Sequence, residues 1–240
     1  MKLSNHTAHY RIDAEHFDYF EQHSTADHDS ARRIQDAVWD CARIASSDTV
    51  LDMGSGNGWI LERRGAEDRV ATVCVDLGKA NLLRLKEIHG RRVHAVVADA
   101  QHLPFRREAF SRVIASEVLE HVNDPAAAVQ QAAMVLSSGG RFIATTPYKE
   151  VLRYYLCVHC NQPTPANAHL HSFDEHALLE IFGRSDFKET SYFTFQNKAF
   201  HHLRLSPLLR FLPWRAWRVI DRFFTLVSVK CHTILVTGSR

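Results

Sequence analysis

The sequence contains no long uncharged apolar run and no apolar segment near its start. A membrane-spanning helix needs about 18 or more consecutive apolar residues, so we expect none in this chain. Residues 1–17, MKLSNHTAHYRIDAEHF, are polar and lack the apolar core of a secretory signal, so we also expect no signal peptide. Strong charge is missing too: a formal net charge of +2 indicates no overall attraction to nucleic acid or to membranes.

Cysteine is scarce for a chain of 240 residues, and the five that occur form an odd number. A chain of this length buries enough apolar surface to fold without disulfide bonds. Cys74 lies within an apolar run and is expected in the core, which is usual in a reducing compartment. With 45% hydrophobic and 23% charged residues, the composition is that of a soluble globular protein. We therefore predict a cytoplasmic protein in which residues 1–240 form a single domain.

Short apolar runs rich in β-branched residues alternate with helical patterns between residue 30 and about residue 147. The runs that have the character of buried strands are DTVLDM (48–53), RVATVCVD (69–76), RVHAVVAD (92–99), SRVIAS (111–116) and GRFIATT (140–146). Helical spacing lies between them, as in DPAAAVQQAAMVL (124–136), where Asp124 is the expected N-cap and Pro125 the first helical residue. This alternation predicts an α/β fold, a doubly wound and mostly parallel sheet with helices on both faces.

The flanking segments complete the expected domain. Residues 1–45 are predicted to form a helical cover, and FDEHALLEIF (173–182) a later helix. Residues 187–195 and 231–238 have the pattern of strands, and we expect them to pair as an antiparallel hairpin at the sheet edge. Residues 199–229 would then be an amphipathic insert between the last two strands.

A glycine-rich turn follows the first predicted strand, in VLDMGSGNGW (50–59). Glycines let the chain turn sharply and let a cofactor lie against the backbone. A dinucleotide-binding turn needs another small residue three positions after Gly56, and that position holds Trp59. Together with Asp52 on the preceding strand, this spacing favours S-adenosylmethionine over a pyrophosphate cofactor.

Two further carboxylates stand at the ends of the next two predicted strands. Asp76 ends the second strand, where its carboxylate can accept hydrogen bonds from both hydroxyls of a ribose. Asp99 ends the third strand, where it can accept from an adenine amino group. Each aspartate alone is more often a helix cap or a solvated loop residue. Acids at the ends of three successive strands point to one crevice, the usual ligand site of an open α/β sheet.

Five motifs in order now resemble a known family: VLDMGSGNG, VCVDLG, VVADAQHLPF, SEVLEHVNDP and VLSSGGRFIATTP. The chain resembles the class I S-adenosylmethionine-dependent methyltransferases of type 11, close to the ubiquinone-biosynthesis enzymes, over roughly residues 30–182. The resemblance implies the strand order 3-2-1-4-5-7-6. It places Asp52 and the glycines at the methionine, Asp76 at the ribose, and Asp99 with Ala100 at the adenine. The cofactor-binding residues it implies are Asp52, Gly54, Ser55, Gly56, Gly58, Asp76, Leu77, Asp99, Ala100 and Ser116.

Methyl transfer from a sulfonium needs mainly alignment of the nucleophile and exclusion of water. A general base is required only if the nucleophile keeps a proton at neutral pH. The candidates near the crevice are His121, Glu117 and Tyr148. Glu117 and Glu120 could instead be acids that stabilise a helix N-terminus. No Asn-Pro-Pro-Tyr follows the fourth strand, so methylation of an amide or ring nitrogen of the kind that motif serves is not favoured.

Residues 157–172 form a candidate zinc loop. Cys157 and Cys160 have the spacing of a zinc knuckle, and His169 and His171 could complete a tetrahedral site. The arrangement is similar to a subgroup of these methyltransferases with a C-x2-C pair followed by histidine, in which the matching histidine is His169. The other interpretation is a pair of free thiols in a loop.

The histidine at 169 has a competing use. Glu117, Glu120 and His121, followed later by His169, resemble the metal site of small-RNA 2′-O-methyltransferases and of some ubiquinone-pathway enzymes. Two carboxylates and two imidazoles could hold Mg²⁺ or Mn²⁺ beside an attacking hydroxyl. His169 cannot serve both metals, so one of the two hypotheses must be wrong.

The C-terminal insert combines arginines, among them Arg204 and Arg222, with tryptophans and phenylalanines. It is expected to pack as amphipathic helices on the sheet edge. Two other uses remain open, a lid over the substrate site or contact of residues 203–224 with anionic lipid.

The sequence therefore predicts transfer of a methyl group from S-adenosylmethionine to a small-molecule acceptor, O- or C-directed, with a hydrophobic or lipid-linked acceptor suiting the insert. One alternative is a metal-dependent RNA 2′-O-methyltransferase, although nucleic acid needs a broader basic surface than this charge provides. Another is a module that binds the cofactor without turnover.

Overall fold

A computed structural model describes residues 5–18, 20–21, 25–64, 70–203, 205–228 and 230–240. Arg204 of the insert, Arg69 at the start of a predicted strand and residues 1–4 of the predicted cover lie outside these ranges. No helix among the described residues is long and apolar enough to cross a membrane.

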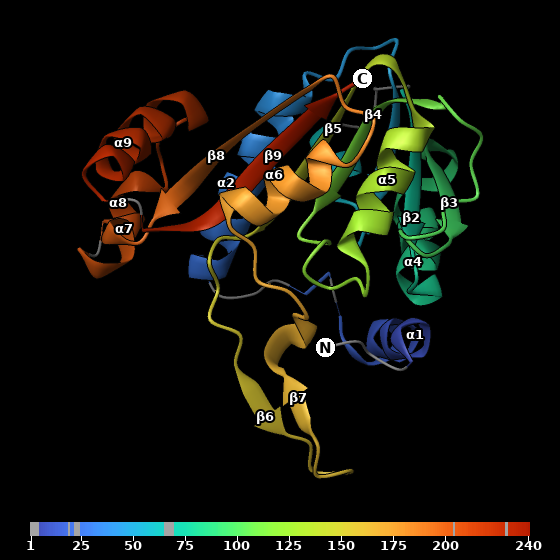
Figure 1. Ribbon diagram of the computed structural model, residues 1–240, viewed down its shortest axis with the longest axis horizontal. Helices are drawn as coiled ribbons and strands as arrows, with labels where there is room; N and C mark the ends of the chain where they lie inside the picture. Colours follow the sequence, from blue (N-terminus) through green and yellow to red (C-terminus); the bar gives the residue numbers. More distant parts are fainter. Residues whose placement is uncertain (1–4, 19, 22–24, 65–69, 204, 229) are drawn as a thin grey trace.

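One sheet of seven strands organises the described chain (Figure 1). Its strands are β1 (Thr49–Met53), β2 (Ala71–Asp76), β3 (Val93–Val97), β4 (Phe110–Ser116), β5 (Leu136–Pro147), β8 (Glu189–Asn197) and β9 (Cys231–Ser239). They lie in the order β3-β2-β1-β4-β5-β9-β8. Strands β1 to β5 run parallel, whereas β9 is antiparallel to both of its neighbours. Because β8 and β9 are the sixth and seventh strands of this sheet along the chain, the predicted order 3-2-1-4-5-7-6 is confirmed.

Helices cover both faces of the sheet, with α5 and α6 on one face and α2 on the other (Figure 1). The helices are α1 (His6–His16), α2 (Thr25–Ala42), α3 (Trp59–Arg64), α4 (Lys79–His89), α5 (Pro125–Val135), α6 (Glu175–Gly183), α7 (Ala199–His202), α8 (Ser206–Leu209) and α9 (Trp214–Val227), with the 3-10 turns η1 (Gly90–Arg92) and η2 (Ala166–Ala168). Leu51 and Phe142 belong to the core shared with α5 and α6, whereas their neighbours Val50 and Ile143 belong to the core shared with α2. Alternate strand residues therefore serve opposite layers, which explains why the strands are apolar throughout.

Capping side chains fix where two of the connecting helices begin. The carboxylate of Asp124 accepts a hydrogen bond from the Ala127 N–H at 3.0 Å, and Pro125 is the first residue of α5, as predicted. The carboxylate of Asp174 accepts from the Ala177 N–H at 2.9 Å at the start of α6. These caps end the two loops that carry residues to the carboxyl edge of the sheet.

A separate hairpin of β6 (Tyr154–Leu156) and β7 (Pro163–Pro165) extends from one end of the molecule (Figure 1). Its turn is closed by the backbone: the Cys157 N–H donates to the Gln162 carbonyl at 3.0 Å, and the Asn161 N–H donates to the Cys157 carbonyl at 2.8 Å. The sequence indicated a loop here, and the strands were not predicted.

The insert between β8 and β9 consists of α7, α8 and α9, and α9 packs along β8. Asp221 of α9 is fully buried and accepts hydrogen bonds from the Asn197 N–H at 2.8 Å and from the Arg218 guanidinium at 2.9 Å. On the other side, Arg33 of α2 donates to the carbonyl of Leu209 at 2.9 Å, ahead of α9. The insert is therefore fixed to two elements of the domain.

Replacement of Asp221 tests how strongly α9 is held. We expect Asp221→Ala to lower the free energy of unfolding by about 2–4 kcal/mol, because it leaves a buried N–H and a partly buried guanidinium without their acceptor. Asp221→Asn keeps a neutral acceptor and should cost less. Urea denaturation of the three proteins measures these differences, and a loss in Asp221→Ala no larger than about 0.5 kcal/mol, as at an ordinary surface position, would contradict the anchoring role.

Candidate active site

A pocket lies where the parallel strands β1, β2, β3 and β4 reach their carboxyl ends. It is lined by Tyr10, Gly54, Gly56, Val75, Asp76, Leu77, Asn81, Ala98, Asp99, Ala100, Glu117, Val118, His121 and Val122. Six of the ten predicted cofactor residues are in this set. The other four, Asp52, Ser55, Gly58 and Ser116, do not line the pocket.

The glycine-rich turn after β1 is held against β2, since the Gly54 N–H donates to the Val75 carbonyl at 2.8 Å. Gly54 has φ +77°, and a β-carbon there would lie 2.6 Å from Val118 Cγ2. Gly58 has φ +70°, and its β-carbon would lie 2.4 Å from Leu85 Cδ2. Glycine at these positions therefore lets α4 and the β4–α5 loop pack directly on the turn, and Gly58 acts through this packing rather than by lining the pocket.

The carboxylate of Asp76, at the carboxyl end of β2, is positioned by backbone N–H groups. Its two carboxylate oxygens accept hydrogen bonds from the Gly56 N–H at 2.9 Å and from the Gly78 N–H at 2.7 Å. Burial raises the pKa of Asp76, and these N–H groups act in the opposite direction. The carboxylate of Asp99 accepts from the Gln101 N–H at 2.9 Å on the neighbouring loop. Both carboxylates thus line one pocket and are held in place by backbone N–H groups.

Asp52 lies near this pocket but is buried within β1, with 2% of its surface exposed. One of its carboxylate oxygens accepts no hydrogen bond from the described part of the chain. Burial, together with the charge of Asp76, raises the pKa of Asp52 to about 7. A raised pKa means that the fold tolerates the protonated form of this residue better than the ionised form.

Glu117 and His121 follow β4, and both line the pocket. Glu117 has φ +56°, an unusual value that is maintained because its N–H donates to the backbone and hydroxyl oxygens of Thr145, each at 3.1 Å. Burial raises the pKa of Glu117 to about 7. The third predicted catalytic residue, Tyr148, does not line the pocket: its hydroxyl donates to Glu175 at 2.8 Å.

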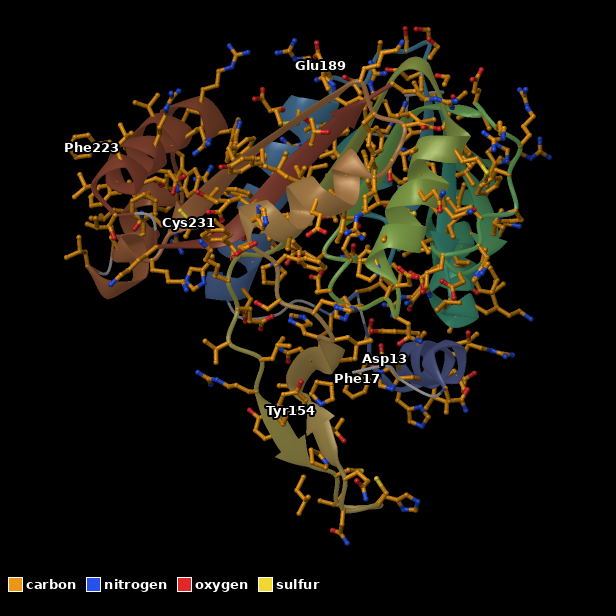
Figure 2. All side chains as sticks on the ribbon, viewed as in Figure 1. Asp13, Phe17, Tyr154, Glu189, Phe223 and Cys231 are labelled. Carbon is orange, nitrogen blue, oxygen red and sulfur yellow. The ribbon has the colours of Figure 1, made fainter. Side chains whose placement is uncertain are left out.

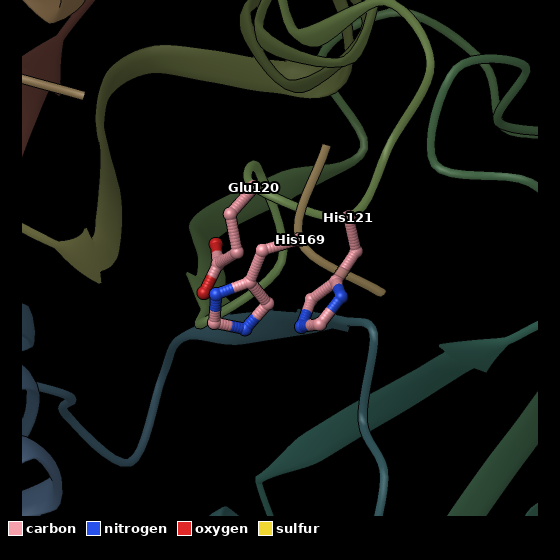
Figure 3. A group of neighbouring side chains, drawn as sticks. All are labelled: Glu120, His121 and His169. Atoms are coloured by element: carbon pink, nitrogen blue, oxygen red, sulfur yellow. The ribbon is translucent and has the colours of Figure 1, made fainter. Parts of the chain in front are cut away.

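Beside the pocket, Glu120, His121 and His169 gather with their ligand atoms within 4.8 Å of one another (Figure 3). The fully buried Glu120 accepts no hydrogen bond on either carboxylate oxygen from the described residues, and burial together with Glu117 raises its pKa well above the usual value. His169 reaches it because the Leu170 N–H donates to the Glu120 carbonyl at 2.7 Å. Glu150 lies 2.5 Å from Nδ1 of His169.

The structure does not bring the four predicted zinc ligands together. Cys157 and Cys160 lie in the turn of the β6–β7 hairpin, whereas His169 lies with Glu120, and His171 Nε2 lies 2.9 Å from the Val122 carbonyl. Within the part of the chain that is described, the only group of three or more metal-ligating side chains is Glu120, His121 and His169. The close sequence spacing was misleading because the hairpin carries the cysteines away from the segment that returns to Glu120.

Tyr10 of α1 is a pocket residue that the sequence did not predict. Its hydroxyl donates to the His121 carbonyl at 3.4 Å, its ring meets the His121 ring edge-on at 5.9 Å, and burial raises its pKa. Helix α1 can lie close to the start of α4 because Gly78 has no side chain. A β-carbon at Gly78 would lie 2.5 Å from the β-carbon of Ala14 in α1. The sequence predicted a helical cover here, but its pattern did not indicate which face of the helix lies against the pocket.

This strand order, with a glycine-rich turn and acids at the carboxyl ends of β1 and β2, defines the fold class of S-adenosylmethionine-dependent methyltransferases. A solved S-adenosylmethionine-dependent methyltransferase from Mesorhizobium loti has the same fold, with a TM-score of 0.58 and 17% identity, covering 85% of this chain and 98% of that one. The sequence profile of the methyltransferase domain family matches residues 9–192. The chain therefore belongs to the methyltransferase domain family.

Curated relatives resemble part of the chain. The 27-O-demethylrifamycin SV methyltransferase of Amycolatopsis mediterranei is 30% identical over 131 residues, 52% of this chain and 48% of that protein. The ubiquinone biosynthesis O-methyltransferase of Alkalilimnicola ehrlichii is 32% identical over 131 residues, 51% of each chain. The mitochondrial arginine-hydroxylase NDUFAF5 of Danio rerio is 27% identical over 146 residues, 61% of this chain and 43% of that protein. The chain thus spans about half the length of the curated relatives it matches.

The raised pKa of Asp52 predicts a pH dependence of stability. The pKa of an aspartate in the unfolded chain is about 4. The contribution of the protonated Asp52 to stability is therefore fully present below about pH 4 and is lost as the pH rises through about 7, the pKa of Asp52 in the folded protein. Between pH 5 and pH 8, we expect the free energy of unfolding of the cofactor-free wild-type protein to fall by about 2–3 kcal/mol more than that of Asp52→Asn. Urea denaturation at both pH values measures this, with the exposed Asp186→Asn as control. Equal losses in wild type and Asp52→Asn would contradict the assignment.

Proposed function

We propose that this protein transfers a methyl group from S-adenosylmethionine to a small-molecule acceptor. The observation that carries the proposal is the pocket of a methyltransferase-family chain in which Asp76 and Asp99 stand at the ends of adjacent strands beside an open glycine turn. The rifamycin and ubiquinone relatives are named as methyltransferases of small molecules, which supports this class of acceptor.

The residues of the pocket fit the cofactor's parts. The carboxylate of Asp76 keeps lone pairs beyond its two backbone hydrogen bonds and would accept from the ribose hydroxyls. The carboxylate of Asp99, beside Ala100, would accept a hydrogen bond from the adenine amino group. Gly56 has no atom within 4 Å of the place where a β-carbon would stand, so its backbone is open to the methionine portion. Asp52 and Ser116, which do not line the pocket, would act by supporting these residues.

When bound, S-adenosylmethionine would supply an activated methyl group on a positively charged sulfur. Glu117 and His121 face the same pocket and would orient the acceptor atom and hold its proton. A carboxyl group with a pKa of about 7, as Glu117 has, is partly ionised at neutral pH and suits the removal of a proton from a hydroxyl. The site therefore suits an acceptor that carries a hydroxyl group.

Cofactor affinity tests the assignment of Asp99. We expect Asp99→Ala to bind S-adenosylmethionine about 10- to 100-fold more weakly in isothermal titration calorimetry, the loss of one charge-assisted hydrogen bond. The surface variant Asp186→Ala should bind as the wild type does. If Asp99→Ala kept the wild-type affinity, the adenine assignment would be wrong. Formation of S-adenosylhomocysteine with a small-molecule extract then separates an enzyme from a module that only binds the cofactor.

One observation favours a second, metal-assisted form of this function. Glu120 is a buried carboxylate without hydrogen-bond partners among the described residues, and two imidazoles stand beside it. A divalent cation would compensate the charge of this group in its ionised form. Glu120, His121 and His169 would hold it, and Glu150 behind His169 would orient that ring. When bound, the ion would lower the pKa of an acceptor hydroxyl.

The metal hypothesis does not require RNA as the acceptor. A 2′-hydroxyl of RNA is one hydroxyl among many, and the chain's net charge of +2 provides little attraction to phosphates. We therefore propose a small-molecule hydroxyl as the acceptor with or without the metal.

Elemental analysis tests the metal centre against the zinc hypothesis. After dialysis against Mn²⁺ or Zn²⁺ and removal of free ion, we expect about one ion per chain in wild type and in Cys157→Ser. The variant His169→Ala should bind much less, because it loses one of three ligands, while the exposed His176→Ala should match wild type. Loss of metal in Cys157→Ser but not in His169→Ala would instead place the ion at the hairpin turn, and no ion in any protein would leave a metal-free enzyme.

A further inference from the structure

Helix α9 carries apolar side chains on two opposite sides, and only those on the inner side pack against the rest of the domain. On the inner side Trp217 is buried, and its ring stacks with Trp214 at 5.5 Å and meets Phe200 at 5.7 Å. Phe224 meets the Phe200 ring at 5.2 Å. These aromatic contacts and the anchor at Asp221 hold α9 against β8, so its outer side is not needed for the fold.

The outer side of α9 carries an exposed apolar stripe. Val219, Phe223 and Leu226 are 70%, 64% and 79% exposed, and Val227 beside them is 76% exposed. The spacing of three and four residues places these side chains on one face of the helix. Figure 2 shows Phe223 at the outer end of the molecule, directed away from the sheet. We call these four residues together the α9 outer face.

Positive charge accompanies this stripe. Residues 199–230 contain six lysines and arginines and a single acid, Asp221. That acid is fully buried and paired with Arg218, so it does not offset the exposed charges. Arg215 and Arg222 are exposed, on the same side of α9 as the stripe. The surface therefore combines insertable apolar side chains with cations and presents no acid.

We propose that the α9 outer face binds the surface of an anionic lipid bilayer. The apolar side chains would enter the region between headgroups and acyl chains, with the helix parallel to the membrane. The guanidinium groups of Arg215 and Arg222 would remain among the lipid phosphates, since long arginine stems allow the charge to stay at the interface. A second copy of the chain is a poorer partner, because a two-fold contact would bring these arginines towards their own counterparts.

The location of the α9 outer face is compatible with the pocket. Helix α9 packs on β8, which forms one edge of the sheet, whereas the pocket lies among β1 to β4 towards the other edge. Membrane contact would thus leave the pocket open. The inference rests on α9 alone and does not depend on the proposed methyl transfer.

Vesicle sedimentation tests the inference with the full chain. The probes are vesicles of phosphatidylcholine alone and of phosphatidylcholine with phosphatidylglycerol. We expect binding to the anionic vesicles about ten-fold stronger than to the neutral ones. Phe223→Glu should weaken the anionic binding about ten-fold or more, and Arg215→Glu combined with Arg222→Glu should abolish the preference for anionic lipid. The matched control is Ile88→Glu on α4, at a side chain that is 53% exposed, which should bind like the wild type.

Other outcomes would overturn the inference. Wild-type protein that binds neither kind of vesicle would refute it, as would equal losses in Phe223→Glu and Ile88→Glu. Light scattering without lipid provides the remaining check: a dimer that Phe223→Glu dissociates would assign the α9 outer face to a second copy. Unchanged S-adenosylmethionine affinity or an unchanged melting curve establishes that each variant is folded.

Discussion

The parallel register of β1, β2, β3 and β4 is the constraint on which the rest of this structure depends. Parallel strands end at the same edge, and the pairing of Met53 with Val75 and of Asp76 with Val97 brings their loops together there. Backbone N–H groups released at that edge, such as those of Gly56 and Gly78, are satisfied by Asp76. The carboxyl ends of the parallel strands, where Asp76 satisfies the N–H groups of the loops, are thus also the place where a ligand can bind.

This geometry concentrates acids in a poorly solvated region. Asp52 and Glu120 are buried, Glu117 lines the pocket, and burial raises the pKa of all three side chains. Apolar residues of similar size would fill the same space at a lower cost in free energy. Raised pKa values in and beside one pocket are more common at functional sites than in cores that only pack.

Much of the fold was predictable because it depends on local patterns. The apolar strand runs, the cap at Asp124 and the glycine turn are encoded within short segments, and the resemblance to a known family supplied the order of the strands. The grouping of His169 with Glu120 could not be chosen over its grouping with the cysteines in the same way. The Leu170 N–H donates to the Glu120 carbonyl and brings His169 to Glu120, whereas the hairpin carries Cys157 away, so the residue nearer to His169 in sequence is not its neighbour in space. Tyr10 was missed because its contact arises only when α1 settles on Gly78.

The position of α1 makes one wall of the pocket independent of the sheet. Tyr10 forms part of that wall, and α1 rests on the domain through close contacts of small residues such as Ala14 rather than through a deep apolar core of its own. A displacement of α1 would therefore reshape this wall while the parallel strands that position Asp76 and Asp99 stay in place.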